Sequence, residues 1–449
     1  MLNEMTIDKK RINKQFRHYV IPSMIAMLFS GFYSIVDGLF VGNSIGDAGL
    51  AAINIVYPIQ VVLNATAIGI GIGGSVLVSI YKGEENEKEM NHSAILTIGM
   101  LLLFGIILPL FFLATKDVLL DFLGAKGAIF DGANDYITTI LIGGMLPVLG
   151  NGLNPIVRNQ GKPIVATRNM VAGLVTNIIL DYVFIYKMNL GMFGAARATI
   201  TAQGVVASLN IIYVIKLNRK TFDISFLKPD IEKIKRILKI AVSPFGQTLV
   251  PSIIIILTNW KCLEYGGDGA AAIYSVISYV LACAQLLIQG IGDGVQPLLS
   301  YYYGAKKDRE LEYVYNKAFL LCAVFSIFLM LMTVVFSTKL AEYFNISQAL
   351  MSETVLALKT TSFAYAFFGV TRVTSAYFYA TNKTKFSNIL IYIEPIVIAP
   401  MMLIVFTELF GLTGVWMAYP AIQILLSVLS LVFKSPNIEY KREISTESI

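Results

Sequence analysis

Apolar residues run through this chain in segments of about 20 to 30 residues, separated by short stretches of charged or turn-forming residues. A helix needs roughly 20 residues to cross the ~30 Å hydrocarbon core of a membrane, so each segment is long enough for one span. Twelve such segments occur, near residues 16–42, 48–81, 92–115, 132–157, 163–188, 192–215, 238–263, 269–302, 314–338, 350–380, 386–409 and 411–433. The sequence therefore predicts an all-α polytopic membrane protein with twelve transmembrane helices.

The composition agrees with this class. The 449 residues are 56% hydrophobic and only 14% charged, whereas soluble domains carry about 25% charged residues. The basic N-terminal stretch leads into a full-length span rather than a short apolar segment with a cleavage site, so we expect no cleavable signal peptide. Cys262, Cys283 and Cys322 are odd in number and lie in or beside apolar runs, which favours buried packing residues over a disulfide framework.

Lysine and arginine gather in alternate connections between the spans, which is typical of loops that stay in the cytoplasm. The basic connections contain Lys9, Lys10, Arg11, Lys14, Arg17, Lys82, Lys88, Arg158, Lys162, Arg168, Lys306, Lys307, Arg309, Lys383 and Lys385, with further cations in both tails and in residues 216–239. We therefore expect a multi-pass protein of the cytoplasmic (inner) membrane with both termini in the cytoplasm. The formal charge of +6 follows from this topology, and a nucleic-acid partner is not expected.

The second half of the chain repeats the first at an offset near 220 residues. Glycines 69, 71 and 73 correspond to glycines 290, 292 and 294, and Tyr81 and Gly83 correspond to Tyr302 and Gly304. Six spans in each copy leave both copies in the same orientation, related by an axis along the membrane normal. The repeat predicts two pseudo-symmetric six-helix lobes, residues 1–218 and 239–449, joined by a cytoplasmic linker at 219–238, with substrate bound near the midplane and access alternating by rocking or helix bending.

Two aspartates, Asp37 and Asp181, lie inside apolar runs of the first copy. They are the strongest indication of function. A lone acid at the centre of a membrane helix costs about 2.5 to 3.5 kcal/mol, so it usually faces a polar cavity and handles an ion or a proton. Asn177 precedes Asp181 by one helical turn, and Thr199 offers a hydroxyl in the next span; with Asp37 they make an oxygen-only set that suits a hard cation. Sodium binding and proton binding remain alternatives, and a purely structural role for the acids is the competing interpretation.

Other polar residues within the spans give weaker signals. Glu394 and Arg372 either pair inside the second lobe or contact substrate. Asp293 is expected to be solvated or to pack between helices. Tyr33 and Met27 are candidates for a cavity that accepts varied apolar ligands. Pro22 lies in the same span as Asp37, and its missing N–H predicts a bend that follows protonation of that acid.

Enzyme classes find little support in the sequence. The glycine clusters are not followed by a Lys-Ser/Thr pair and have no βαβ context, so we interpret them as small-residue helix packing rather than nucleotide loops. His18 and His92 have no nucleophile or metal-type partner nearby in the sequence. We expect no catalytic activity, and no cofactor or metal other than a coupling ion.

The chain resembles the multidrug and toxic compound extrusion (MATE) family over essentially its whole length. The resemblance is carried by Pro22, Tyr33, Asp37, Gly42, Asn154, the segment 158–161, Asn177, Asp181, the segment 194–196, Thr199, Gln296, Pro297, Tyr302 and Gly304. It implies a twelve-helix, two-lobe antiporter that exports amphipathic, often cationic drugs or metabolites in exchange for Na+ or H+. In prokaryotic members that resemble this chain, the residues matching Asp37, Asn177, Asp181 and Thr199 form the cation site, and those matching Tyr33 and Asn154 lie by the drug cavity.

The resemblance is incomplete in the second lobe. Some branches of the family place essential acids in the seventh and tenth spans, where this chain has Asn259 and Arg372, so coupling through that lobe is not expected. The sequence leaves two alternatives to efflux: a lipid-linked saccharide flippase of the same superfamily, which would need cations in its cavity, and a non-transporting membrane receptor or scaffold. The expected partners are small-molecule drugs or metabolites and membrane lipid, and the expected state is a monomer.

Overall fold

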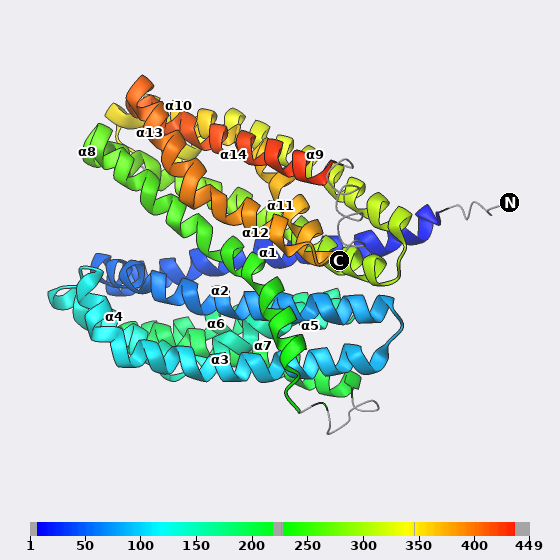
Figure 1. The fold of residues 1–449 in the computed structure, drawn as a ribbon. Helices are drawn as coiled ribbons and strands as arrows, with labels where there is room; N and C mark the ends of the chain where they lie inside the picture. The colour runs from blue at the N-terminus through cyan, green and yellow to red at the C-terminus, as the bar shows by residue number, and fades with distance from the viewer. Residues whose placement is uncertain (1–6, 219–225, 227, 345, 436–449) are drawn as a thin grey trace. The chain divides into compact units, whose positions relative to one another are not determined.

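The computed structural model describes residues 7–218, 226, 228–344 and 346–435. All regular elements in these ranges are helices (Figure 1). Nine of the described helices are long and apolar enough to cross a membrane, and a bent pair, α4 with α5, makes a tenth span. The prediction of an all-α membrane protein is confirmed.

The first copy of the repeat forms the helices α1 (Lys9–Ile45), α2 (Asp47–Gly83), α3 (Glu87–Phe122), α4 (Gly127–Ile142), α5 (Met145–Asn159), α6 (Pro163–Asp181), the π-helix η1 (Tyr182–Lys187) and α7 (Gly191–Asn218). The second copy forms α8 (Ile231–Gly304), α9 (Asp308–Tyr343), α10 (Gln348–Ser362), α11 (Tyr365–Ala380), α12 (Thr384–Ile393), the π-helix η3 (Glu394–Ile398), α13 (Ala399–Phe410) and α14 (Leu412–Lys434).

The continuous α8 contains two spans, because its backbone leaves the helical region at Gly267, where φ is 59° and ψ is −152°. The α10–α11 pair, interrupted at residues 363 and 364, takes the same place in the second copy as the bent α4–α5 pair takes in the first. The twelve predicted spans correspond to α1, α2, α3, α4 with α5, α6 with η1, α7, the two arms of α8, α9, α10 with α11, α12 with η3 and α13, and α14.

The duplication is visible in the backbone itself. Gly46, before α2, has φ of 82°, and Gly267, between the arms of α8, has φ of 59°. Glu85 and Lys306, after the second span of each copy, have φ of 58° and 55°. Both pairs are 221 positions apart (267 minus 46, and 306 minus 85). Left-handed backbone is uncommon for residues other than glycine, so its recurrence at equivalent positions shows that the two copies turn in the same way.

Glycines let α2 lie against its neighbours. A Cβ added to Gly71 would collide with the carbonyl oxygen of Gly152 on α5, and one added to Gly74 would collide with Thr97 on α3. Membrane helices have no hydrophobic drive to associate in lipid, so close backbone approach through small residues supplies van der Waals contact instead. The interpretation of the glycine clusters as packing surfaces is confirmed for α2.

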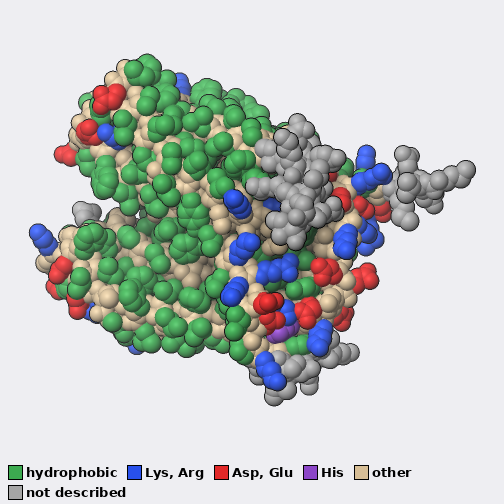
Figure 2. Space-filling model, in the orientation of Figure 1, with side chains coloured by type: hydrophobic (Ala, Val, Ile, Leu, Met, Phe, Trp, Pro, Cys, Tyr) green, Lys and Arg blue, Asp and Glu red, His purple; other side chains and the backbone are tan. Residues whose placement is uncertain are grey.

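Hydrophobic side chains cover the outer faces of the helices, and charged side chains gather near the helix ends (Figure 2). On α3, for example, Leu103 and Leu110 are more than half exposed. The three cysteines are free; Cys262 and Cys322 are buried, but Cys283 is exposed, contrary to the expectation for all three. Cys283 lies on an outward face of α8, which the local sequence does not reveal.

The described residues group into two compact units. Unit 1 contains the chain up to Leu249 together with Ser300–Asp308, and unit 2 contains Val250–Leu299 and the chain from Arg309 onward. The predicted lobe boundaries stay a prediction, and residues 219–225 and 227 of the predicted linker lie outside the described residues.

The start of α8 is tied to α3 within unit 1. Asp230 caps α8 by accepting the backbone N–H of Lys233, a bond that holds the pKa of this carboxyl below its usual range. The Lys233 ammonium lies 2.6 Å from Glu89 and 2.9 Å from the Nδ1 atom of His92. These contacts explain why the first turns of α8 group with the first copy of the repeat.

Candidate ion-binding site

The two intramembrane aspartates of unit 1 lie on α1 and α6. Asp181 and Asn177 are completely buried, one turn apart on α6. Asp37 on α1 interacts electrostatically with Asp181, so the two carboxyl groups belong to one site. Directly after Asp181 the helix widens into the π-helix η1. Such π-segments are rare and occur frequently at functional sites.

The site contains buried polar atoms without a hydrogen-bond partner among the described residues. They are one carboxyl oxygen of Asp37, both carboxyl oxygens of Asp181, and both the amide oxygen and nitrogen of Asn177. Buried polar groups are almost always paired, and leaving them unpaired costs about 1 to 3 kcal/mol each. Three unpaired acid oxygens and one amide oxygen therefore form a set of ligands suited to a small cation or a proton.

Hydroxyl groups from neighbouring helices complete the site. The Tyr33 hydroxyl of α1 donates to the Thr199 hydroxyl of α7 at 3.4 Å. Tyr136 of α4 is buried, interacts electrostatically with both acids, and lies within side-chain hydrogen-bonding reach of Thr199 and of Gln60 on α2.

The structure thus brings together five of the predicted site residues and adds two. Asp37, Asp181, Tyr33 and Thr199 meet through the interactions above, with Asn177 one turn from Asp181. Sequence reasoning missed Tyr136 and Gln60. A usable signal existed, since both are polar side chains within predicted spans, but only the helix rotations show that they face the acids.

The donor chemistry fits a hard cation. Carboxylate, amide and hydroxyl oxygens are the ligands of alkali and alkaline-earth ions, whereas transition metals favour nitrogen and sulfur. In the described part of the chain, no three His, Cys, Asp or Glu side chains come together as a metal cluster. The oxygen-only set therefore fits Na+, and two neighbouring acids equally fit a shared proton.

The remaining predicted residues of unit 1 lie elsewhere on the same helices. Asn154 on α5 donates its amide to the carbonyl of Ala166 on α6 at 2.9 Å. Met27 is partly buried on α1. Pro22 lies inside the uninterrupted α1, and its carbonyl accepts the hydroxyl of Thr167 at 2.9 Å. Their predicted cavity and bending roles stay predictions.

Unit 2 has a buried charge cluster of its own. Arg372 on α11 is 9% exposed, and Asp293 on the second arm of α8 is 6% exposed. Arg372 interacts electrostatically with both Asp293 and Glu394, and Glu394 accepts a hydrogen bond of 2.8 Å from Gln423 on α14. Asp293 is therefore buried beside an arginine rather than solvated, because α8 turns this residue towards α11.

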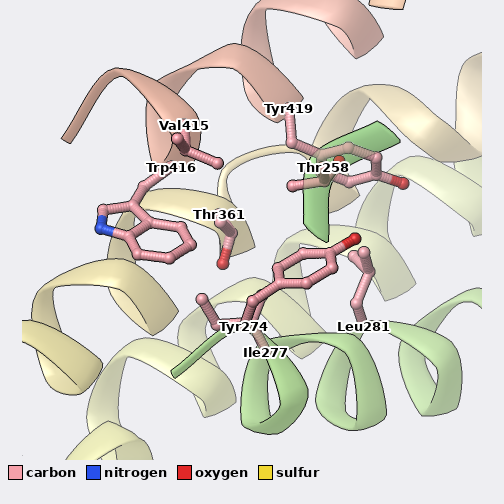
Figure 3. A pocket seen from close by; sticks show the side chains of 8 residues that line it. All are labelled: Thr258, Tyr274, Ile277, Leu281, Thr361, Val415, Trp416 and Tyr419. Carbon is pink, nitrogen blue, oxygen red and sulfur yellow. The ribbon is translucent and has the colours of Figure 1, made fainter. Parts of the chain in front are cut away.

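A small cavity in unit 2 is lined by aromatic and hydroxyl side chains. Tyr274 of α8 and Trp416 and Tyr419 of α14 point towards it, with Thr258 and Thr361 beside them (Figure 3). Its volume is about 10 Å³, which is the size of one water molecule and far below the several hundred Å³ of a drug site. This cavity therefore belongs to the core of unit 2 and is not the predicted drug cavity.

Replacing Tyr136 tests whether the hydroxyls belong to the ion site. Tyr136→Phe removes one hydroxyl beside both acids and keeps the ring, so we expect the affinity of the site for a cation to fall about fivefold, the effect of one hydrogen bond. Binding of Na+ to the purified protein, measured against its concentration, would show this as a shifted midpoint. Tyr182→Phe, on the exposed face after Asp181, is the matched control and should leave the midpoint unchanged; an equal shift in both variants would contradict the assignment.

Comparison with known proteins identifies the family. The profile of the MatE family matches residues 22–183 and again 244–404, one match in each copy of the repeat. The multidrug export protein MepA of Staphylococcus saprophyticus is 27% identical over 412 residues, covering 91% of this chain and 90% of that protein.

Solved structures of MATE transporters are also similar to this chain over nearly its whole length. The outward-facing conformation of a multidrug resistance MATE family transporter superposes with a TM-score of 0.90 at 25% identity, over 96% of this chain and 97% of that one. A MATE crystal structure in complex with MaL6 has the same TM-score, identity and coverage. With its duplicated family match and full-length similarity, this chain belongs to the MatE family of multidrug and toxic compound extrusion transporters.

Proposed function

We propose that this protein is a cation-coupled multidrug antiporter, which exports amphipathic and often cationic small molecules by alternating access. One observation carries the proposal: Asp37, Asn177 and Asp181 present buried oxygen atoms that have no partner among the described residues. A site that binds and releases a cation in every cycle needs such oxygens, whereas purely structural acids would be paired permanently. The names of the multidrug export relatives support the substrate class.

Coupling in this proposal follows from differential binding. The ion and the drug drive each other only if each binds the two access states with different affinity. With the cation bound, the repulsion between the two carboxylates is reduced and they can approach; without it, their repulsion disfavours the same geometry. The widened η1 segment next to Asp181 offers a place where α6 can change shape as the charge changes.

The buried Arg372 supports coupling through unit 1 alone. In unit 2 the acids Asp293 and Glu394 interact with the guanidinium of Arg372, which is a permanent part of the chain. The side-chain amide of Gln423 also donates a hydrogen bond to Glu394. A fixed guanidinium remains charged at all physiological pH values and cannot leave. The acids of unit 2 therefore stabilise that unit, and the exchangeable ion is assigned to the acids of unit 1.

Replacing Arg372 tests this structural role. Arg372→Met leaves two buried acids without their cation, and breaking a buried charge group in this way costs about 3 to 5 kcal/mol. We expect a clear fall in the melting temperature of the purified protein, and partial recovery when Glu394→Gln is added. Arg197→Met, at an exposed arginine beside Phe193, is the control. A melting temperature equal to that of the control would contradict the role.

The alternatives have less support. A flippase for lipid-linked saccharides would need cations for a pyrophosphate group, whereas the site in unit 1 contains two acids and no Lys or Arg among the residues assigned to it. A receptor or scaffold has no need of unpaired buried acids. We further propose an inner-membrane location with cytoplasmic termini, on the distribution of basic residues, and a monomer as the transporting species.

The decisive test is efflux from proteoliposomes loaded with ethidium. We expect transport when an inward Na+ or H+ gradient is imposed, and no transport when both gradients are abolished. Imposing the two gradients separately identifies the ion. Equal dye movement with and without any gradient would overturn coupling, and no dye movement under any condition would overturn efflux of this substrate class.

A further inference from the structure

Four helix ends meet at one end of unit 1: the starts of α1 and α8 and the ends of α2 and α8. The first turns of α8, up to Leu249, and its last turns, Ser300–Asp308, group with unit 1 although the repeat assigns them to the second copy. This end also carries the α2–α3 connection with Lys82 and Lys88, which the basic-residue pattern assigns to the cytoplasm.

Two hydrogen bonds at this end are equivalent under the repeat. The Tyr302 hydroxyl donates to the side-chain oxygen of Gln15 at 2.6 Å. The Arg236 guanidinium donates to the Tyr81 hydroxyl at 3.4 Å and lies 5.9 Å above the Tyr81 ring centre. Both members of the second pair differ from those of the first by 221 positions (302 minus 81, and 236 minus 15). The second helix of each copy thus bonds to the first helix of the other copy.

The closest helix approach here is reciprocal as well. A Cβ added to Gly83 would collide with the carbonyl oxygen of Tyr301, and one added to Gly304 would collide with the carbonyl oxygen of Ile80. These two contacts also differ by 221 positions, as 304 minus 83 and 301 minus 80 show. The repeat therefore exchanges the two helices of this contact and leaves the contact the same. An interface that lies on a two-fold axis has this property. The contact between Gly83 and Gly304 within unit 1 is therefore locally two-fold symmetric.

The contact continues inward along α2. Gly69 and Gly73, one turn apart, lie against the backbone of α8 at Ala241 and Ile237. Tyr302, Gly83 and Gly304 are buried, so the ends of α2 and α8 are in close contact at this point. Because glycines have no side chains that interdigitate, α2 and α8 can separate at this contact without repacking of side chains. The two polar bonds contribute about 1 kcal/mol each, which is weak enough to break in every cycle.

We propose that one cluster of six residues forms the cytoplasmic gate of the transport cycle. The cluster consists of Gln15, Tyr81, Gly83, Arg236, Tyr302 and Gly304. In this structure the gate is closed by the two equivalent hydrogen bonds, Tyr302 to Gln15 and Arg236 to Tyr81, which we call the latches. The inference rests on the proposed alternating access, which requires one closure at the cytoplasmic end to open. The latches hold the closed state and contact neither ion nor drug, so they act as positioning residues. Loosening either latch shifts the population towards the open state.

Cysteine labelling tests the gate without relying on transport. Ser300, fully buried one turn before Gly304, becomes the reporter as Ser300→Cys, probed with a membrane-impermeant maleimide on inside-out vesicles. The wild-type chain gives the background from its three cysteines. We expect slow labelling of the reporter alone, about fivefold faster labelling with Tyr302→Phe or Arg236→Met, and about 25-fold with both, because two independent bonds add. Tyr303→Phe is the matched control, expected to leave the rate unchanged.

A reversible cross-link gives the second test. Gln15→Cys with Tyr302→Cys, joined by a short bis-methanethiosulfonate, should lower efflux at least tenfold, with recovery on reduction. The control pair, Lys116→Cys with Asn134→Cys, replaces side chains that are also 2.6 Å apart but join α3 to α4 within one copy; its cross-link should leave efflux unchanged.

The outcomes separate the gate from the proposed function. Labelling rates that are the same in the latch variants and in the Tyr303 control, or full efflux through the cross-linked gate pair, would overturn the gate. Rates that rise as expected in a protein that moves no ethidium would support the gate and count against multidrug efflux.

Discussion

Asp37→Asn and Asp181→Asn are each expected to reduce ion-driven ethidium efflux at least tenfold. Each change keeps the size of the side chain and removes one negative charge from the pair of acids that interact electrostatically. A single remaining carboxylate attracts a monovalent cation less strongly, and an amide cannot take up the exchanged proton. A tenfold loss needs only about 1.4 kcal/mol, well within the contribution of a charged ligand in a buried site.

The measurement is dye efflux from vesicles at matched protein levels, with membrane insertion checked by immunoblot. Asp135→Asn is the control, because this acid is exposed on α4 next to Tyr136 and takes no part in the site. We expect the control to transport normally. If both site variants kept full gradient-dependent efflux, the ion site would have to lie elsewhere.

Gly71→Val should prevent stable assembly of unit 1. Any Cβ at this position would collide with the carbonyl oxygen of Gly152, and a backbone atom cannot rotate away as a side chain can. Overpacking usually costs about 1 to 3 kcal/mol, and a clash between two helix backbones lies at or above the upper end of that range. Separating α2 from α5 would also loosen Gln60, which faces Tyr136 at the ion site.

The comparison is with Gly99→Val. Gly99 lies in α3, and no atom lies within 4 Å of a Cβ added there. Both variants therefore change helix propensity by the same amount, and they differ in the collision with Gly152, which only the Gly71 variant makes. We expect the Gly71 variant to lose its monodisperse peak in size-exclusion chromatography and the Gly99 variant to keep it. Equal behaviour of the two proteins would show that the α2–α5 contact is less close than the structure places it.

Several features of this protein can be predicted from its sequence. The twelve spans, the duplication and the two acids follow from local sequence, because a bilayer demands long apolar runs and makes each buried charge conspicuous. The helix breaks were harder to foresee. Residues 363 and 364 interrupt a predicted continuous span, and Pro22, a helix-breaking residue, leaves α1 intact.

The amino-acid sequence by itself determined the membrane class, the two-fold repeat and the acids Asp37 and Asp181, since each depends on residue type and spacing along one helix. Only the tertiary structure decided that Tyr136 and Gln60 face those acids, that Asp293 is buried beside Arg372, and that Tyr302 bonds to Gln15. The physical reason is that such meetings depend on how each helix is rotated and where it crosses its neighbour, and local periodicity in an all-apolar span carries almost no information about either.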